Sequence, residues 1–143
     1  MKIKIKKINP ETKLPEYAHP GEDVGMDVFS QENYILQPGE RRVFYVGFAL
    51  EFPPGYAAIV KDKSSLPNHH GIHTMGGVYD AGYRGEYNIQ LINLGQNPVE
   101  IKKEQKIAQL VIFPVALCEL EEVAELDNTS SRGTGQFGST GEF

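Results

Sequence analysis

The chain has 143 residues, 40% of them hydrophobic and 23% charged, with a formal net charge of −5 at pH 7. This length predicts one globular domain that buries roughly two-thirds of its unfolded surface. The acidic balance argues against general nucleic-acid binding, and no apolar run is long enough to predict a membrane span. The stretch MKIKIKKINP lacks the apolar core of a signal peptide, and the single cysteine, Cys118, fits a reducing cytoplasm.

Periodicity favours β structure along most of the chain. Residues 2–8 (KIKIKKI) alternate at Ile3 and Ile5 as a half-buried strand does. Short β-branched or aromatic runs follow in RRVFYVGFALEF, YAAIVK, YNIQLINL and KIAQLVIFPV, with turn signals such as LQPGE, FPPG and NLGQNP between them. SSLPNHH is the one stretch typical of a short helix, with Ser64 or Ser65 as its N-cap. The sequence therefore predicts an all-β sandwich or barrel with one short helix.

Two stretches in the first half of the chain carry polar groups suited to a site. HPGEDVGMDVFS places Asp27 and two other acids just before an apolar strand. VKDKSSLP places Lys61, Lys63, Ser64 and Ser65 at the start of the expected helix, where ammonium groups and helix N–H groups favour anions. Solvated turn acids and a capped helix with surface lysines are the alternatives.

The stretch GIHTMGGVYDAGYRGEYNIQLIN contains the best candidate for a general base. Gly76 and Gly77 predict a hairpin turn between two apolar arms. Asp80 ends the second arm among apolar and aromatic neighbours, so we expect it to be partly desolvated and more basic, as activation of water requires. An aspartate that only caps a turn is the alternative. His70 and His73 have no acid or cysteine close by in the sequence, which argues against a zinc site.

The segment SSRGTGQFGSTGEF is rich in glycine. The spacing of Gly133 and Gly138 matches a Walker A loop, but the lysine and the following helix are missing, so a P-loop is rejected. Glycine amides and Arg132 nevertheless suit a phosphate, and Phe137 can stack on a nucleobase. A flexible tail without function is the alternative.

Five stretches, in this order, resemble the five motifs of the homotrimeric dUTPases: GEDVGMD, DKSSL, GGVYDAGYRGEYNIQLIN, KIAQLVI and RGTGQFGSTG. The resemblance runs from about Ala18 to Gly141. It implies a jelly-roll-like distorted β-barrel and Mg²⁺-dependent hydrolysis of dUTP to dUMP and pyrophosphate. It also implies a homotrimer with shared active sites that limits uracil in DNA and supplies dUMP for dTMP synthesis. Residues 1–129 would form the β domain and residues 130–143 its lid.

The resemblance also assigns residues. Asp80 matches the base that activates water, and Asp27 matches the aspartate that holds magnesium through water. Tyr83 matches the ring that packs on the deoxyribose, and Phe137 the ring that covers uracil. The substrate-binding positions as a whole are Lys63, Ser64, Ser65, Gly77, Val78, Tyr79, Tyr83, Asn88, Gln109, Arg132, Phe137, Gly138, Ser139 and Thr140.

The chain departs from the family pattern at several places. Lys63 stands where arginine is usual, and Gly82 replaces an aspartate. The usual Gly-Asp-Arg of the fourth motif is Glu104, Gln105 and Lys106 here. These changes affect phosphate affinity and turn geometry more than the type of reaction.

Two rival functions belong to the same fold. The similar dCTP deaminases place a catalytic glutamate ten residues after the shared aspartate, where this chain has Gln90. An amide cannot accept and return a proton, which argues against deamination. A noncatalytic dUTP-binding or regulatory module is the second rival, and a turnover assay with magnesium separates it from an enzyme.

Overall fold

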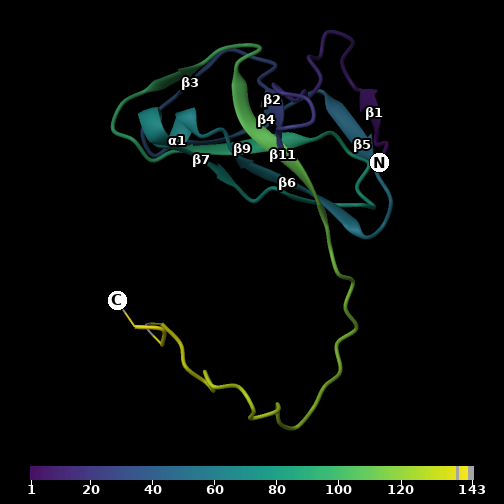
Figure 1. The fold of residues 1–143 in the computed structure, drawn as a ribbon. Coiled ribbons are helices and arrows are strands. Elements are labelled where there is room, and N and C mark those ends of the chain that lie inside the picture. The colour runs from purple at the N-terminus through teal and green to yellow at the C-terminus, as the bar shows by residue number, and fades with distance from the viewer. Residues whose placement is uncertain (138, 142–143) are drawn as a thin grey trace.

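The computed structural model describes residues 1–137 and 139–141 and is almost entirely β (Figure 1). Its elements in chain order are β1 (Lys4–Lys7), β2 (Met26–Phe29), β3 (Tyr34–Leu36), β4 (Arg41–Tyr45), β5 (Phe48–Glu51), β6 (Tyr56–Asp62), α1 (Ser65–His70), β7 (Ile72–Met75), β8 (Val78–Asp80), β9 (Asn88–Asn93), β10 (Val99–Ile101) and β11 (Lys106–Pro114). The expected all-β architecture with one short helix is confirmed. Among the residues described, no helix is long and apolar enough to cross a membrane.

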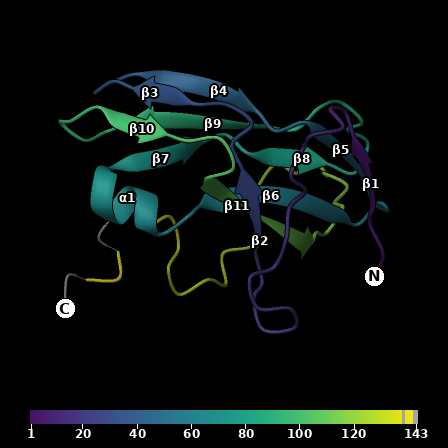
Figure 2. The same ribbon diagram turned by 90° about the horizontal axis from the view of Figure 1, so that it is seen from above.

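Two antiparallel sheets form the body of the fold, and Figure 2 shows them as stacked layers. One has the strand order β2-β11-β6-β8 and the other β4-β9-β7, while β1 pairs with β5 and β3 with β10. A single buried cluster joins the layers, with Val60 and Leu110 from the first sheet and Phe44 and Leu91 from the second. Because burying one such side chain contributes roughly 1.5–3 kcal/mol, this shared core fixes how the layers stack.

Strand β9 shows how alternation divides core from site. Ile89 and Leu91 are buried, whereas Asn88 and Gln90 point to the opposite face. The two amides therefore lie side by side on one face of the strand.

Two expected strands differ in detail. The run RRVFYVGFALEF is not one strand but β4 and β5, because Gly47 between them has a φ of 72° that a strand cannot hold. Residues 2–8 are less buried than their alternation predicts. Ile3 is half-buried, but Ile5 is 39% exposed, since β1 pairs with β5 alone.

The predicted hairpin at Gly76 and Gly77 is wrong. Its two arms, β7 and β8, pair with β9 and β6 respectively, so the two glycines turn the chain from one sheet into the other. Their φ angles are 63° and 96°, and a Cβ on Gly77 would lie 2.8 Å from Cβ of Val60. Glycine at this corner is required by backbone conformation and by close packing.

The chain after β11 runs away from the sheets (Figure 1). Residues 115–129, which we call the C-terminal arm, are exposed throughout, as are residues 130–137. Leu117, Leu120 and Leu126 leave most of their surface in water. The arm therefore carries apolar side chains that the body of the same chain does not cover.

Candidate active site

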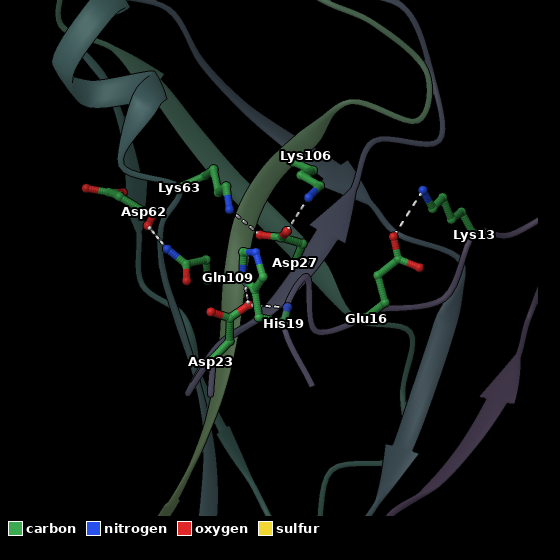
Figure 3. A network of polar contacts seen from close by, with 9 residues as sticks. All are labelled: Lys13, Glu16, His19, Asp23, Asp27, Asp62, Lys63, Lys106 and Gln109. Atoms are coloured by element: carbon green, nitrogen blue, oxygen red, sulfur yellow. Dashed lines mark hydrogen bonds and ion pairs between the residues drawn. The ribbon is translucent and has the colours of Figure 1, made fainter. Parts of the chain in front are cut away.

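A buried carboxylate stands at the centre of a polar cluster between β2, β11 and the end of β6 (Figure 3). Asp27 is 1% exposed, and its Oδ1 and Oδ2 lie 2.7 Å from Nζ of Lys63 and Nζ of Lys106 respectively. Burial raises the pKa of Asp27, but the contacts with Lys106 and Lys63 outweigh it and hold this pKa below its ordinary value. Both oxygens of Asp27 thus contact an ammonium group, but the buried Oδ2 accepts no hydrogen bond from the residues described.

Strand register brings a third predicted residue to this cluster. Gln109 on β11 lies opposite Asp27 on β2 and opposite Lys61 on β6. Its Nε2 donates to the backbone oxygen of Asp62 at 3.0 Å. A Cβ on Gly25 would lie 2.7 Å from Oε1 of Gln109, so only glycine leaves room for the amide at that position.

The two serines at the start of α1 remain open. Ser64 occupies the expected N-cap position, but its side chain makes no capping hydrogen bond. Ser64 and Ser65 are both exposed. Their hydroxyls are thus placed beside Lys63 without a role in holding the helix.

The aspartate beside Lys63 ties β6 to β7. Asp62 accepts hydrogen bonds from the backbone nitrogen and the hydroxyl of Thr74 at 2.6 and 2.7 Å, and it lies 2.7 Å from Nδ1 of His73. Burial raises the pKa of Asp62, but the hydrogen bonds from Thr74 and His73 have the larger combined effect. The pKa of Asp62 therefore lies below its ordinary value. The residues described contain no group of three or more histidine, cysteine, aspartate or glutamate side chains placed to hold a metal ion.

A pocket of about 260 Å³ lies at the other end of β6. Its lining residues are Gly77, Val78, Tyr79, Asp80, Tyr83, Asn88 and Gln90. Six of these seven are substrate or catalytic residues predicted from the sequence; Gln90 is the exception. The partial desolvation predicted for Asp80 is wrong for the single chain, because its side chain is exposed at the open mouth of this pocket.

The outer edge of β8 offers free backbone groups to this pocket. β8 is the last strand of its sheet and pairs with β6 on one side only. The N–H of Val60 donates to the carbonyl of Gly77 at 2.7 Å. Since bonded and non-bonded positions alternate along an antiparallel pair, the N–H and carbonyl of Val78 face outward. These two backbone groups place one hydrogen-bond donor and one acceptor at the wall of the pocket.

Stacked tyrosines support the floor of the pocket. The ring of Tyr79 lies 4.0 Å from the ring of buried Tyr87, and Tyr83 lies 5.3 Å from Tyr79 and 5.7 Å from Tyr87. The Tyr79 hydroxyl donates to the carbonyl of Asn88 at 2.6 Å and accepts from its N–H at 3.0 Å. Burial raises the pKa of Tyr79, so the hydroxyl stays protonated. Tyr79 thereby joins β8 to β9.

The predicted lid residues form a separate group. Arg132, Phe137, Ser139 and Thr140 line a hollow of their own, and Nε of Arg132 donates to the carbonyl of Gly135 at 3.1 Å. Phe137 is fully exposed. Gly138 lies outside the described residues.

One chain does not bring these groups together. Asp80 pairs with Ala57 at one end of β6, and Lys63 follows the other end, six residues later. At about 3.3 Å per residue, the two lie about 20 Å apart along the strand. The Asp27 cluster and the Asp80 pocket are thus two halves of a site in different places.

Sequence reasoning missed two features of the Asp27 cluster. Lys106 was noted only as part of the altered fourth motif, although a lysine at the start of an apolar strand is a signal of a buried acidic partner. Glu104 has a φ of 65°, the conformation that the glycine usual at this position would adopt without strain. Its turn positions Lys106, since the Glu104 N–H donates to the carbonyl of Ser30 at 2.8 Å.

Comparison with known proteins gives a consistent result. A profile of the dUTPase family matches residues 11–141. The deoxyuridine 5'-triphosphate nucleotidohydrolase of Clostridium kluyveri is 45% identical over 143 residues, covering 99% of both chains. That of Nautilia profundicola is 45% identical over 144 residues, covering 99% of this chain and all of the relative.

Solved structures agree with the sequence relatives. The dUTPase of Staphylococcus bacteriophage 80alpha with dUpNHpp superposes with a TM-score of 0.92 at 28% identity, covering 98% of each chain. A mutant dUTPase from phage phi11 of S. aureus, described with a structural Mg(II) ion, gives 0.83 at 25% identity and covers 89% of this chain and 99% of its own. The expected jelly-roll-like fold is confirmed by this likeness.

Proposed function

The chain belongs to the dUTPase family, and on this premise we propose that it hydrolyses dUTP to dUMP and pyrophosphate with Mg²⁺. The observation that carries the assignment to this chain's own residues is the pocket along β8. It combines a carboxylate (Asp80), an aromatic ring (Tyr83) and the free backbone groups of Val78. The free backbone groups suit a nucleobase, the aromatic ring suits a sugar, and the carboxylate suits activation of an attacking water.

Uracil pairs with the free edge of β8. The Watson–Crick edge of uracil presents acceptor, donor and acceptor, and a fixed backbone row can match it. A base with the wrong pattern would leave buried groups unpaired, which costs far more than a missing methyl contact. Tyr83 packs on the deoxyribose and leaves no room for a 2'-hydroxyl.

Asp80 then acts as general base. It takes a proton from a water molecule that attacks the α-phosphorus, and pyrophosphate leaves with the electrons of the broken P–O bond. Lys63, Arg132 and the lid amides neutralise charge on the phosphates, while Gln109 and the two serines contact phosphate or water. Closure of the lid, with Phe137 over the uracil, supplies the desolvation that Asp80 lacks in the open pocket.

The residues present do not fit a metal ion resident in the free protein. Both oxygens of Asp27 already contact ammonium groups, and the described residues place no group of three or more metal-ligating side chains around it. Magnesium favours phosphate oxygens and water, so we write it as part of the substrate, Mg·dUTP, where it neutralises phosphate charge. With Lys63 turned to a phosphate, Asp27 would hold the magnesium ion through water, and the ion would neutralise phosphate charge there.

The two halves of the site meet between subunits of a homotrimer. Asp80 and the Asp27 cluster cannot reach one dUTP within a chain if they stay about 20 Å apart. The C-terminal arm also leaves Leu117, Leu120 and Leu126 in water, and a neighbouring subunit would cover them. A three-fold symmetric trimer would bring the two halves of the site together and cover the three leucines. It would also place each lid (residues 130–143) at a neighbouring subunit's site.

Pyrophosphate release tests this function. The purified protein with Mg²⁺ is offered dUTP, UTP, dCTP and dTTP, and dUTP alone should be turned over efficiently. A chelator should abolish turnover and leave the melting temperature unchanged, because magnesium comes with the substrate. Absence of pyrophosphate release from dUTP would contradict the proposal, and ammonia release from dCTP would favour a deaminase.

A further inference from the structure

The side chain of Gln90 lines the pocket along β8, while its backbone belongs to the central strand of the second sheet. It lies on the open face of β9, two residues from Asn88, and both side chains line the same pocket. Within the described residues, no hydrogen bond joins the Gln90 amide to another group of the protein. Its Nε2 lies 3.9 Å from the place where a Cβ on Gly76 would stand. The amide therefore lies near the corner that leads into β8.

The order of residues along the pocket places Gln90 at the far end of the base. Tyr83 and Asp80 mark the sugar and phosphate end under the proposed function. Asn88, bonded to Tyr79, comes next, and Gln90 lies about 6.6 Å further along β9, next to Gly76. Uracil attached to a sugar at Tyr83 has O2 near the sugar and O4 at its far end. O4 is thus the atom closest to Gln90.

We propose that Gln90 is a substrate-binding residue whose side-chain amide donates a hydrogen bond to O4 of uracil. This proposal rests on the proposed function, since it takes dUTP as the occupant of the pocket. The 4-position is where uracil and cytosine differ, one carrying an acceptor oxygen and the other a donor amino group. An amide has both a donor and an acceptor, so it supports uracil without by itself rejecting cytosine. Rejection of cytosine then falls to the fixed backbone of Val78.

Two substitutions separate the chemistry from the shape. Gln90→Leu keeps a similar volume and removes the donor, and Gln90→Glu keeps the shape but leaves a group that, when ionised, only accepts. Both are measured with dUTP, with 4-thio-dUTP and with dCTP, because sulfur at position 4 keeps N3–H but accepts a hydrogen bond weakly. Gln96, an exposed amide in the turn after β9, provides the matched controls Gln96→Leu and Gln96→Glu.

The expected pattern is specific to a contact with O4. Gln90→Leu should lower kcat/KM about tenfold for dUTP and less than about threefold for 4-thio-dUTP, since a net hydrogen bond is lost only where O4 is present. Gln90→Glu should lower kcat/KM for dUTP by about a hundredfold and reduce the dUTP to dCTP ratio at least about tenfold, because two acceptors then face each other. The Gln96 variants should match wild type.

The outcomes distinguish this inference from the proposed function. Suppose that wild type hydrolyses dUTP, but Gln90→Leu lowers kcat/KM equally for dUTP and 4-thio-dUTP, or lowers it for neither substrate. The contact with O4 is then overturned and the enzyme assignment stands. An unchanged dUTP to dCTP ratio in Gln90→Glu would overturn it as well. If wild type releases no pyrophosphate from dUTP, both proposals fail together.

Discussion

Mixing two inactive variants tests whether each site takes residues from two subunits. Asp80→Asn removes the base. The double variant Lys63→Ala/Gln109→Ala removes Lys63, about 20 Å away along β6, together with the neighbouring Gln109. In a mixed trimer, a site is intact when its Asp80 comes from the double variant and its Lys63 and Gln109 come from the Asp80→Asn chain. Each choice has an even chance in an equal mixture, so about a quarter of the sites are intact in a symmetric assembly of shared sites.

The measurement is recovered turnover. The two variants, carrying tags of different mass, are unfolded together and refolded, native mass spectrometry gives the composition of the trimers, and pyrophosphate release from dUTP is measured. Recovery of about a quarter of wild-type turnover is expected. Each variant refolded alone should stay inactive, and exchanging the tags should change nothing. Mixed trimers with turnover below about a hundredth of wild type would refute the reasoning, since a site built within one chain carries a lesion in every subunit.

Four further results are expected. Asp80→Asn should bind dUTP normally and lower kcat by about a thousandfold, and retention of more than about a tenth of the activity would show that it is not the base. Ending the chain at Ser131 should leave the melting temperature unchanged, because residues 132–137 are exposed, and should lower turnover at least about a hundredfold; full activity would make the tail dispensable. Glu104→Gly should raise the free energy of unfolding in urea by about 0.5–1 kcal/mol by relieving the φ of 65°, whereas a gain of equal size in Glu104→Ala would exclude this cause. Asp62→Asn should lower the free energy of unfolding by about 2 kcal/mol at pH 6 through weaker bonds to Thr74. Because the pKa of Asp62 is lowered in the folded chain, its contribution is complete above the ordinary value of 3.8 and lost as the pH falls below it, so the gap to Asp62→Asn should close there; a gap independent of pH would contradict this.

The sequence alone determined where most of the strands lie and which residues to consider. Alternation and β-branched runs act locally, so segments such as YAAIVK and KIAQLVIFPV were located without knowledge of their partners. The order of the five motifs identified the family, which the comparisons confirm. The special backbone at Gly77 was also readable as a turn, because only glycine adopts such angles without strain.

The tertiary structure decided which segments meet. Adjacent β7 and β8 looked like a hairpin, but β7 pairs with β9 and β8 with β6, so the turn is a corner between sheets and β8 is an open edge. A single sequence contains no record of such non-local pairings. The same limitation applies to Asp27, whose paired lysines come from segments far apart in the chain and meet only because β2, β11 and β6 are neighbours.

Exposure and distance depend on the same packing. Asp80 was expected to be desolvated by its neighbours in sequence, yet those neighbours flank an open mouth, and Asp80 stays in water until something covers it. The length of β6 sets the distance between Asp80 and Lys63. Residue types and local periodicity can be read from the sequence. Burial, charge pairing and the distance between the two halves of the site arise only when remote strands share a core, because they depend on contacts between segments and not on any single segment.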